Sequence, residues 1–473
     1  MKRNWYLVLG VIFFGVLIVY RAREIPMTHD EASTWLNYKH LNVWSCLTNS
    51  ACWGSANNHW LNTLLLQWSS GIGGDTPLAI RFPNVIAGIA YLICSSLICS
   101  RYLSGGLTRF AGVILLVGHV YLLDFFSLAR GYGLMTCGVI WGIYFLLRYL
   151  EIPGRRWLLG SIIAFMFACL SNFTALLVWS AACLSWSLWM VIQRKYSLLV
   201  RHSIYWIVSA LLLWLLLRFP IRLISAIGDF DYGSDNIWAM LKDLVRNLLY
   251  GHLYWGKTSL ILFTGLIIFL ILSVAGAALL QKRYLFRRQI LFLGLLLIIN
   301  FLVIVLQQKI SGSHAPEGRR SIYFIPLIFG FLALGLGLIK NNWFRIVVSF
   351  FASVIIMLHM FYVLPLRNCR EWYFDAYYPE LFSTILPKGS ASDSIRLGTS
   401  WIFNPALSFY QKTTPLPISG LVYQRPLAID SAMQYYYIET QDSVGMAVNG
   451  FVLEKKIGTF LLFKRPGHFD SAQ

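Results

Sequence analysis

Apolar runs of roughly 17–22 residues recur along most of the chain, and they constrain its fold more than any other feature. A bilayer core about 30 Å thick is crossed by about 20 helical residues. The chain is 58% hydrophobic and 12% charged, whereas soluble domains carry about 25% charged residues. The sequence therefore predicts a polytopic membrane protein built from helices.

We expect about eleven membrane-spanning helices, of which those at 157–171 and 174–192 are the weakest because they are short and joined only by Ser171-Asn172-Phe173. The runs lie at 5–20, 78–100, 108–123, 131–150, 157–171, 174–192, 203–219, 258–280, 289–307, 321–339 and 343–364. The first run follows Lys2 and Arg3, and Arg21 and Arg23 come after it in place of a small-residue cleavage site. We interpret it as a retained signal-anchor helix.

The loops between these runs alternate in charge, as expected when cytoplasmic loops are enriched in Lys and Arg. Loops expected inside carry Lys2, Arg3, Arg101, Arg109, Arg155, Arg156, Arg194, Lys195, Arg201, Lys282, Arg283, Arg287, Arg288, Lys340 and Arg345, with the acid Glu151. Loops expected outside carry Asp30, Glu31, Asp124, Asp229, Asp231, Asp235, Asp243 and Glu317. The pattern predicts a cytoplasmic N-terminus. It also explains the net charge of +19 without a nucleic-acid partner.

Two segments do not fit the series of spans. Residues 58–74 are apolar but short, and counting them as a span would invert every later loop, so we expect an interfacial or re-entrant helix. Residues 365–473 lack a spanning run, and short alternating stretches at 395–398, 450–455 and 459–464 predict strands, with Gly458 in a hairpin turn. The predicted domains are an all-α membrane domain at 1–364 and a small external α/β domain at 365–473.

Two cysteines, Cys46 and Cys52, share the first external loop. They could form a disulfide in an oxidising compartment or remain reduced thiols. The sequence leaves both alternatives open.

Polar side chains gather at the outward ends of the predicted spans, which places them on one side of the membrane. They are His29, Asp30, Glu31, His59, Asp124, Arg130, Asn172, His252, Lys257, His314, Glu317, Arg319 and Arg320. If the helices pack as a bundle, these residues line one outward-facing cavity. Carboxylates there suit acid–base chemistry, and the cations suit an anion. Since charge near lipid is costly, the cluster around Asp30 predicts a functional centre.

Each of these residues also has a structural interpretation. Asp30 and Glu31 could cap a helix over 32–38, and Asp124 and Arg130 could form an ion pair at the membrane surface. His59, His252 and His314 could be structural histidines. Arg319 and Arg320 could anchor the chain at lipid head groups.

Four ordered motifs resemble the GT-C superfamily of membrane glycosyltransferases that use polyprenyl-phosphate sugars. The closest branch is that of protein O-mannosyltransferases and lipid A aminoarabinose transferases. The first motif is the acidic pair in His29-Asp30-Glu31, and the second is Asn58-His59-Trp60 leading into 76–88, a stretch similar to the family pattern A-x-R-x-P-S-x-x-x-G. The third is Ser127-Leu128-Ala129-Arg130-Gly131-Tyr132-Gly133-Leu134, which is similar to E-A-R-x-Y-x-L. The fourth is Arg320-Ser321-Ile322-Tyr323, which precedes Pro326. The family often has His-Pro-Pro where this chain has His59-Trp60-Leu61, and Glu where it has Leu128.

The resemblance implies an integral-membrane glycosyltransferase with a GT-C fold. It implies Asp30 as general base, with Glu31 orienting it. Arg319, Arg320 and Lys257 would bind the donor phosphate. His29, His59, Asp124, Arg130, Tyr132 and His314 would contact substrate or sugar. A divalent cation, Mg²⁺ or Mn²⁺, could bind at Asp30 and Asp124, since both supply oxygen ligands.

The expected partners are a polyprenyl-phosphate sugar, membrane lipids and an acceptor that is a protein, a lipid or a glycan. Short loops favour a bacterial inner membrane, with the active site on the periplasmic side. Two rival functions remain. A lipid-linked sugar flippase or transporter would need charges within spans and broken helices at mid-membrane. A polysaccharide polymerase or ligase would rely on a large late loop with several Arg residues. A structural or assembly role is a third alternative.

Overall fold

The computed structural model describes residues 5–48, 58–226, 228, 233–386, 395–414, 416–422, 427 and 429–466. These residues form two compact units. The larger, here called the helical unit, comprises the described parts of 1–22, 41–69 and 81–364. The smaller, here called the sheet unit, comprises the described parts of 23–40, 70–80 and 365–473. Each unit is described by itself.

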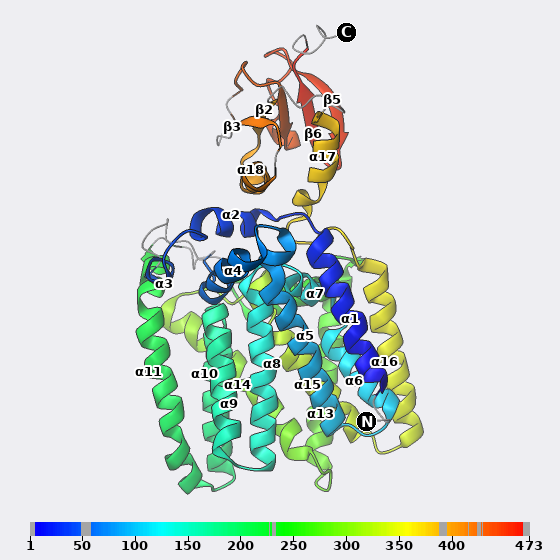
Figure 1. Ribbon diagram of the computed structural model, residues 1–473. Coiled ribbons are helices and arrows are strands. Elements are labelled where there is room, and N and C mark those ends of the chain that lie inside the picture. The colour runs from blue at the N-terminus through cyan, green and yellow to red at the C-terminus, as the bar shows by residue number, and fades with distance from the viewer. Residues whose placement is uncertain are drawn as a thin grey trace. The chain divides into compact units, whose positions relative to one another are not determined.

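Helices make up almost all of the chain up to residue 363 (Figure 1). Their bounds are α1 Trp5–Glu24, α2 His29–Tyr38, α3 Val43–Thr48, α4 Trp60–Gly73, α5 Pro77–Tyr102, α6 Gly106–Val117, α7 Val120–Phe126, α8 Gly131–Glu151, α9 Arg155–Ser171, α10 Ala175–Ile192, α11 Tyr196–Ala226, α12 Ile237–Leu248, α13 Thr258–Leu280, α14 Arg287–Ser311, α15 Phe324–Gly335 and α16 Asn342–Val363. The short strand β1 (Tyr254–Lys257) precedes α13, and the 3₁₀ turn η1 (Gly318–Ser321) precedes α15.

Nine helical segments among the described residues are long and apolar enough to cross a membrane, and the bent pair α6–α7 makes ten. Each of the eleven predicted spans has a helix at its place. One of these helices, α9, has 17 residues and is shorter than the segments that are long enough to cross a membrane. The predicted short helix is α4, whose 14 residues extend about 21 Å at 1.5 Å per residue. That length is too short to cross the bilayer core.

The predicted single span at 108–123 is broken, since α6 and α7 meet at an angle of 66°. The break falls at Gly118 and His119. A Cβ atom at Gly118 would lie 2.5 Å from the side chain of Ile356 on α16. The close approach of α16 therefore requires glycine, which also weakens helix continuation at this point.

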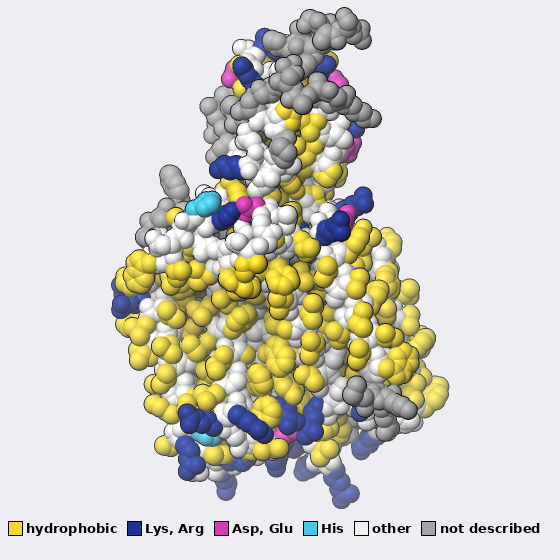
Figure 2. Space-filling model, in the orientation of Figure 1, with side chains coloured by type: hydrophobic (Ala, Val, Ile, Leu, Met, Phe, Trp, Pro, Cys, Tyr) yellow, Lys and Arg dark blue, Asp and Glu magenta, His cyan; other side chains and the backbone are white. Residues whose placement is uncertain are grey.

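Burial separates central from peripheral helices of the helical unit. The apolar stretch containing α15 is 94% buried and that of α8 is 78% buried, whereas α13 and α16 are 11% and 22% buried. Figure 2 shows hydrophobic side chains around this unit and Lys and Arg side chains gathered at one end of it. A polytopic membrane protein has this pattern, because its outer helices face lipid. The direction in which it crosses the membrane stays a prediction.

The sheet unit contains a five-stranded sheet of order β3-β2-β4-β6-β5. The strands are β2 Ile395–Thr399, β3 Ile418–Val422, β4 Tyr435–Ile438, β5 Val452–Ile457 and β6 Phe460–Lys464, and the helices are α17 Tyr378–Ile385 and α18 Asn404–Thr413. β2 pairs in parallel with β3 and β4, and β6 runs antiparallel to β4 and β5. The predicted α/β character is confirmed.

The predicted hairpin is also present. β5 and β6 are joined at Gly458, whose φ of +60° is a left-handed conformation that glycine adopts without strain. The sheet unit takes in 23–40 and 70–80 as well as 365–473, so α2 belongs to it. The sequence did not predict this grouping, and the functional division at residue 364 stays a prediction.

Candidate active site

The acidic pair lies in the first turn of α2. Thr28 is the N-cap, and the carboxylate of Glu31 accepts hydrogen bonds from the Thr28 N–H (3.1 Å) and hydroxyl (2.9 Å). This reciprocal arrangement is a capping box. Glu31 is fully buried, whereas Asp30 is partly exposed. The two carboxylates therefore have different surroundings, and Glu31 has the capping role that the sequence left open.

Residues of the sheet unit hold the start of α2. The backbone N–H of His29 donates to Asp375 Oδ2 at 2.7 Å, and His29 Nδ1 lies 2.7 Å from the carbonyl oxygen of Ile402. The N–H of Met27 donates to the hydroxyl of Tyr410 at 2.8 Å. Three hydrogen bonds thus fix the backbone and side chain just before Asp30. They give His29, predicted to contact substrate, an anchoring role within this unit.

Asp375 is a buried carboxyl beside the acidic pair. It is 1% exposed, and its Oδ1 accepts a hydrogen bond from the hydroxyl of Tyr378. Burial raises the pKa of Asp375 well above its ordinary value, and the charges of Asp30 and Glu31 raise it further, while the hydrogen bonds from Tyr378 and His29 act against them. Burial therefore disfavours the charged form of the Asp375 carboxyl.

The rest of α2 packs on α18. The rings of Trp35 and Phe409 meet edge to face at 5.0 Å, a favourable aromatic geometry. The indole N–H of Trp35 and the ammonium of Lys39 both donate to Asp75. Burial acts to raise the pKa of Asp75, but hydrogen bonds from Lys39, Ser70 and Trp35 outweigh it, so that the pKa is lowered. These contacts attach α2 to the sheet unit along its whole length.

A second group of predicted site residues meets inside the helical unit. We call it the Arg130 cluster, and its members are His59, Arg130, Tyr132, Asn172 and Arg319. Arg130 Nη2 lies 3.1 Å from His59 Nε2, and the amide of Asn172 lies 3.3 Å from His59 Nδ1. The Tyr132 ring meets the His59 ring at 4.9 Å, and the Arg319 guanidinium lies 5.7 Å from the Tyr132 ring centre.

Local backbone features position this cluster. Arg130 is the N-cap of α8, and the amide of Asn62 on α4 donates to the carbonyl of Ala129 at 2.9 Å. α4 thereby brings His59, which directly precedes it, to Arg130. A Cβ atom at Gly131 would lie 2.0 Å from the Ser171 carbonyl oxygen, so only glycine permits this approach.

The chemistry of the Arg130 cluster is cationic. A guanidinium carries only donors, so a hydrogen bond between Arg130 and His59 uses the ring nitrogen Nε2 as acceptor. Arg130 and His59 are almost fully buried, and Arg319 is partly exposed. Two guanidinium groups at one aromatic wall suit an anion, since the guanidinium fork matches phosphate oxygens.

Asp124 forms a buried ion pair with a residue that the sequence analysis did not select. Arg21, at the end of α1, donates to Asp124 Oδ1 at 2.5 Å, and the Tyr250 hydroxyl donates to Oδ2 at 3.0 Å. Asp124 is 1% exposed and Arg21 fully buried. Since a hydrogen bond reaches each carboxylate oxygen, these surroundings fit a metal ion poorly. Among the described residues no group of three or more His, Cys, Asp or Glu side chains has an arrangement that could hold a metal ion, and we derive no step through a cation.

The other predicted residues lie apart from the Arg130 cluster or beside it. Arg320 follows Arg319 in η1 and is partly buried. Lys257 is exposed at the end of β1 and makes no ion pair with any described residue. His314 Nδ1 lies 3.3 Å from the exposed Asp235. Cys52 lies outside the described residues, so the cysteine pairing stays a prediction.

Three residues that matter here were missed by sequence reasoning: Arg21, Tyr250 and Asp375. Arg21 resembled a topology signal because it ends the first apolar run. Asp375 lies 346 residues after His29, in a region without a recognised motif. A buried acid in a Tyr-rich segment was the only signal, and it does not specify a partner.

Comparison with solved structures identifies the fold. The chain has the fold of the GT-C glycosyltransferases, as the motifs predicted. It is similar to the crystal structure of ArnT from Cupriavidus metallidurans bound to undecaprenyl phosphate, with a TM-score of 0.54 and 11% identity over 96% of this chain and 97% of that one. The apo state of the same protein gives a TM-score of 0.55 at 10% identity over the same shares.

A further similar structure is the archaeal oligosaccharyltransferase AglB from Archaeoglobus fulgidus in complex with an inhibitory peptide and a dolichol-phosphate. Its TM-score is 0.51 at 12% identity, over 95% of this chain and 71% of that one. No protein-family model and no curated protein sequence matches the chain. At these identities the likeness establishes the fold.

Proposed function

We propose that this chain is an integral-membrane glycosyltransferase that moves a sugar from a polyprenyl-phosphate donor to an acceptor on the outer face of the membrane. The observation that carries the proposal is the meeting of His59, Arg130, Tyr132 and Arg319 in one cluster of the helical unit. The sequence predicts donor or sugar binding for each of these residues. Undecaprenyl phosphate in ArnT and dolichol-phosphate in AglB add support, because both ligands are lipid phosphates.

In the proposed reaction an acceptor hydroxyl attacks the anomeric carbon of the donor. Asp30 takes the hydroxyl proton, the new glycosidic bond forms, and the bond from the anomeric carbon to the phosphate oxygen breaks. The polyprenyl phosphate leaves with that electron pair, so the anomeric configuration inverts. General-base help of this kind is worth roughly 10²–10⁴-fold.

Two features of the described residues suit these roles. Asp30 is partly exposed, whereas the neighbouring carboxyls of Glu31 and Asp375 are buried and hydrogen-bonded, which favours Asp30 as the group that accepts a proton. Arg319, with Arg320 and Lys257, supplies fixed positive charge for the leaving phosphate. His29, Asp124 and His314 remain candidates for sugar contact.

The orientation follows from the loop charges. We propose a multi-pass protein of a bacterial inner membrane, with the N-terminus in the cytoplasm and residues 365–473 in the periplasm. The inside loops hold the Lys and Arg residues, which favours this direction.

The test is transfer from a panel of synthetic polyprenyl-phosphate sugars by the purified full chain, with Asp30→Asn, the control Asp235→Asn and an EDTA-treated sample. Asp235 is an exposed carboxylate of the same expected face. We expect transfer or slow donor hydrolysis with one sugar, lost in Asp30→Asn and kept in Asp235→Asn. Full activity of a folded Asp30→Asn would refute the assignment of the base. Donor binding without bond cleavage in any sample would favour a flippase.

A further inference from the structure

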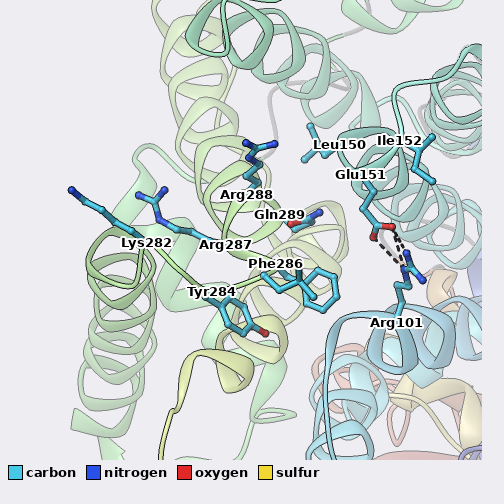
Figure 3. A pocket seen from close by; sticks show the side chains of 11 residues that line it. Arg101, Leu150, Glu151, Ile152, Lys282, Tyr284, Phe286, Arg287, Arg288 and Gln289 are labelled. Atoms are coloured by element: carbon cyan, nitrogen blue, oxygen red, sulfur yellow. Dashed lines mark hydrogen bonds and ion pairs between the residues drawn. The ribbon is translucent and has the colours of Figure 1, made fainter.

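A hollow of about 660 Å³ opens in the helical unit between the ends of α5 and α8 and the α13–α14 connection (Figure 3). Its lining residues are Arg101, Leu150, Glu151, Ile152, Lys282, Tyr284, Leu285, Phe286, Arg287, Arg288 and Gln289. None of them belongs to the Arg130 cluster or to the ion pair of Asp124. The hollow is therefore a separate site that the proposed transferase activity does not use.

The lining of this hollow is cationic. Four of its side chains are Lys or Arg, and Glu151 is its one acid among the described residues. The Glu151 carboxylate accepts from Arg101 at 2.6 Å and from Arg148 at 3.0 Å, so two guanidinium groups already compensate its charge. Lys282 and Arg288 are exposed, and Figure 3 draws Arg288 beside Gln289 on one wall. An anion fits this balance of charge.

The backbone adds to the same preference. Arg287, Arg288 and Gln289 form the first turn of α14, a helix of 25 residues, whose N-terminal dipole favours a negative group. Gln289 is 4% exposed, and its Oε1 has no hydrogen-bond partner among the described residues. A buried carboxamide oxygen without a partner is unusual, and a hydroxyl of an occupant would satisfy it.

The rim of the hollow is apolar as well as basic. Ile152 is 55% exposed and Leu285 is 78% exposed, and both line the hollow. α13 ends beside it with Leu279 and Leu280, which are 58% and 84% exposed. A free phosphate ion would gain nothing from these side chains, whereas the acyl chains of a lipid would cover them.

We propose that this hollow binds the phosphate head group of an anionic phospholipid, with Lys282 and Arg288 at the phosphate and the acyl chains beside Leu285 and Ile152. A head group with hydroxyls, such as a glycerol, would donate to Gln289. Basic hollows between membrane helices are suited to such lipids. The site faces the side of the membrane opposite to the proposed chemistry, where the basic loops lie.

The experiment uses the purified full chain in a neutral detergent, with binding measured by native mass spectrometry and by the shift of the unfolding temperature. The probes are phosphatidylglycerol, phosphatidylcholine and inorganic phosphate. The test variant is Lys282→Gln with Arg288→Gln. The matched control is Arg283→Gln with Lys340→Gln, which removes the same charge from exposed residues outside the hollow. Without lipid, the test variant and the control variant should both unfold at the same temperature as the wild type.

We expect phosphatidylglycerol to bind the wild type and the control, and to bind the test variant roughly tenfold more weakly. Phosphatidylcholine should bind at least tenfold more weakly than phosphatidylglycerol to all three, since it has no net charge. An equal loss of phosphatidylglycerol binding in the two double variants would overturn the proposal, because binding would then depend on net charge alone. The lipid assignment would also fail if inorganic phosphate alone reproduced the stabilisation and phosphatidylglycerol added nothing.

Discussion

The start of α2 and the Arg130 cluster hold their candidate site residues by different means. In the sheet unit, the Asp375 carboxylate and the Tyr410 hydroxyl accept hydrogen bonds from the backbone N–H groups just before Asp30. In the helical unit, close packing at Gly131 and an edge-to-face contact between their rings hold His59 and Tyr132. The first arrangement can respond to protonation, and the second is set by shape. Variants that separate these two kinds of support are the best way to examine the site.

The largest effect is expected at Asp30 itself. Asp30→Asn removes the proposed proton acceptor while keeping the size of the side chain, so the rate of sugar transfer should fall by roughly 10²–10⁴-fold. Initial rates with saturating donor measure this. Asp235→Asn is the matched control and should keep its rate, and a similar fall in both variants would contradict a special role of Asp30.

The next effect concerns stability of the helical unit. Arg21→Met leaves the buried carboxylate of Asp124 without its cation, which we expect to lower the free energy of unfolding by about 3–5 kcal/mol. Loss of the folded fraction on heating measures it. The double variant Arg21→Met with Asp124→Asn should recover much of the loss, because no buried charge remains. If the single variant were as stable as the wild type, the ion pair would make no contribution to the stability of the helical unit.

A smaller effect on rate is expected from the support of α2. Asp375→Ala removes the acceptor of the His29 N–H, and a displaced Asp30 should lower kcat by roughly 10–100-fold. The KM for the donor should stay the same, because the Arg130 cluster is unchanged. Asp375→Asn keeps an acceptor oxygen and should recover most of kcat. A rise in donor KM without loss of kcat would contradict a positioning role.

The smallest effect is on the pH dependence of stability. The folded pKa of Asp375 is raised, so between about pH 4, its unfolded pKa, and that raised value the folded state binds more protons. Stability therefore falls as the pH rises through this window, by at most about 1.4 kcal/mol per pH unit. Unfolding midpoints at several pH values should show a flatter profile for Asp375→Asn, and an unchanged slope would argue against a protonated Asp375.

Much of this molecule was predictable from short-range sequence signals. Apolar runs and loop charges placed a helix at every predicted span, and Gly458 marked a turn because its backbone conformation is local. The motifs also selected His59, Arg130 and Tyr132, which the fold brings together with Arg319. The break between α6 and α7 was missed because it depends on the approach of Ile356 on α16, and apolar periodicity carries no information about a distant neighbour.

The supports of the site were less predictable than the site residues. Asp375 and His29 are 346 positions apart, and their hydrogen bond uses a backbone N–H that every residue has. An ion pair between Asp124 and Arg130 was one alternative from the sequence, and the structure adds Arg21 as a partner of Asp124, which charge type alone does not single out. The grouping of α2 with the sheet follows from ring packing between Trp35 and Phe409, which no local pattern encodes.

The most direct measurement is a comparison of kcat and donor KM for Asp30→Asn and Arg319→Gln under identical conditions. If α2 supplies the base and the Arg130 cluster binds the donor, Asp30→Asn should lose kcat with donor KM unchanged. Arg319→Gln should raise donor KM roughly tenfold, as expected for loss of a charge-assisted contact to phosphate. The opposite division, with Asp30→Asn affecting only KM and Arg319→Gln leaving KM unchanged, would contradict the account.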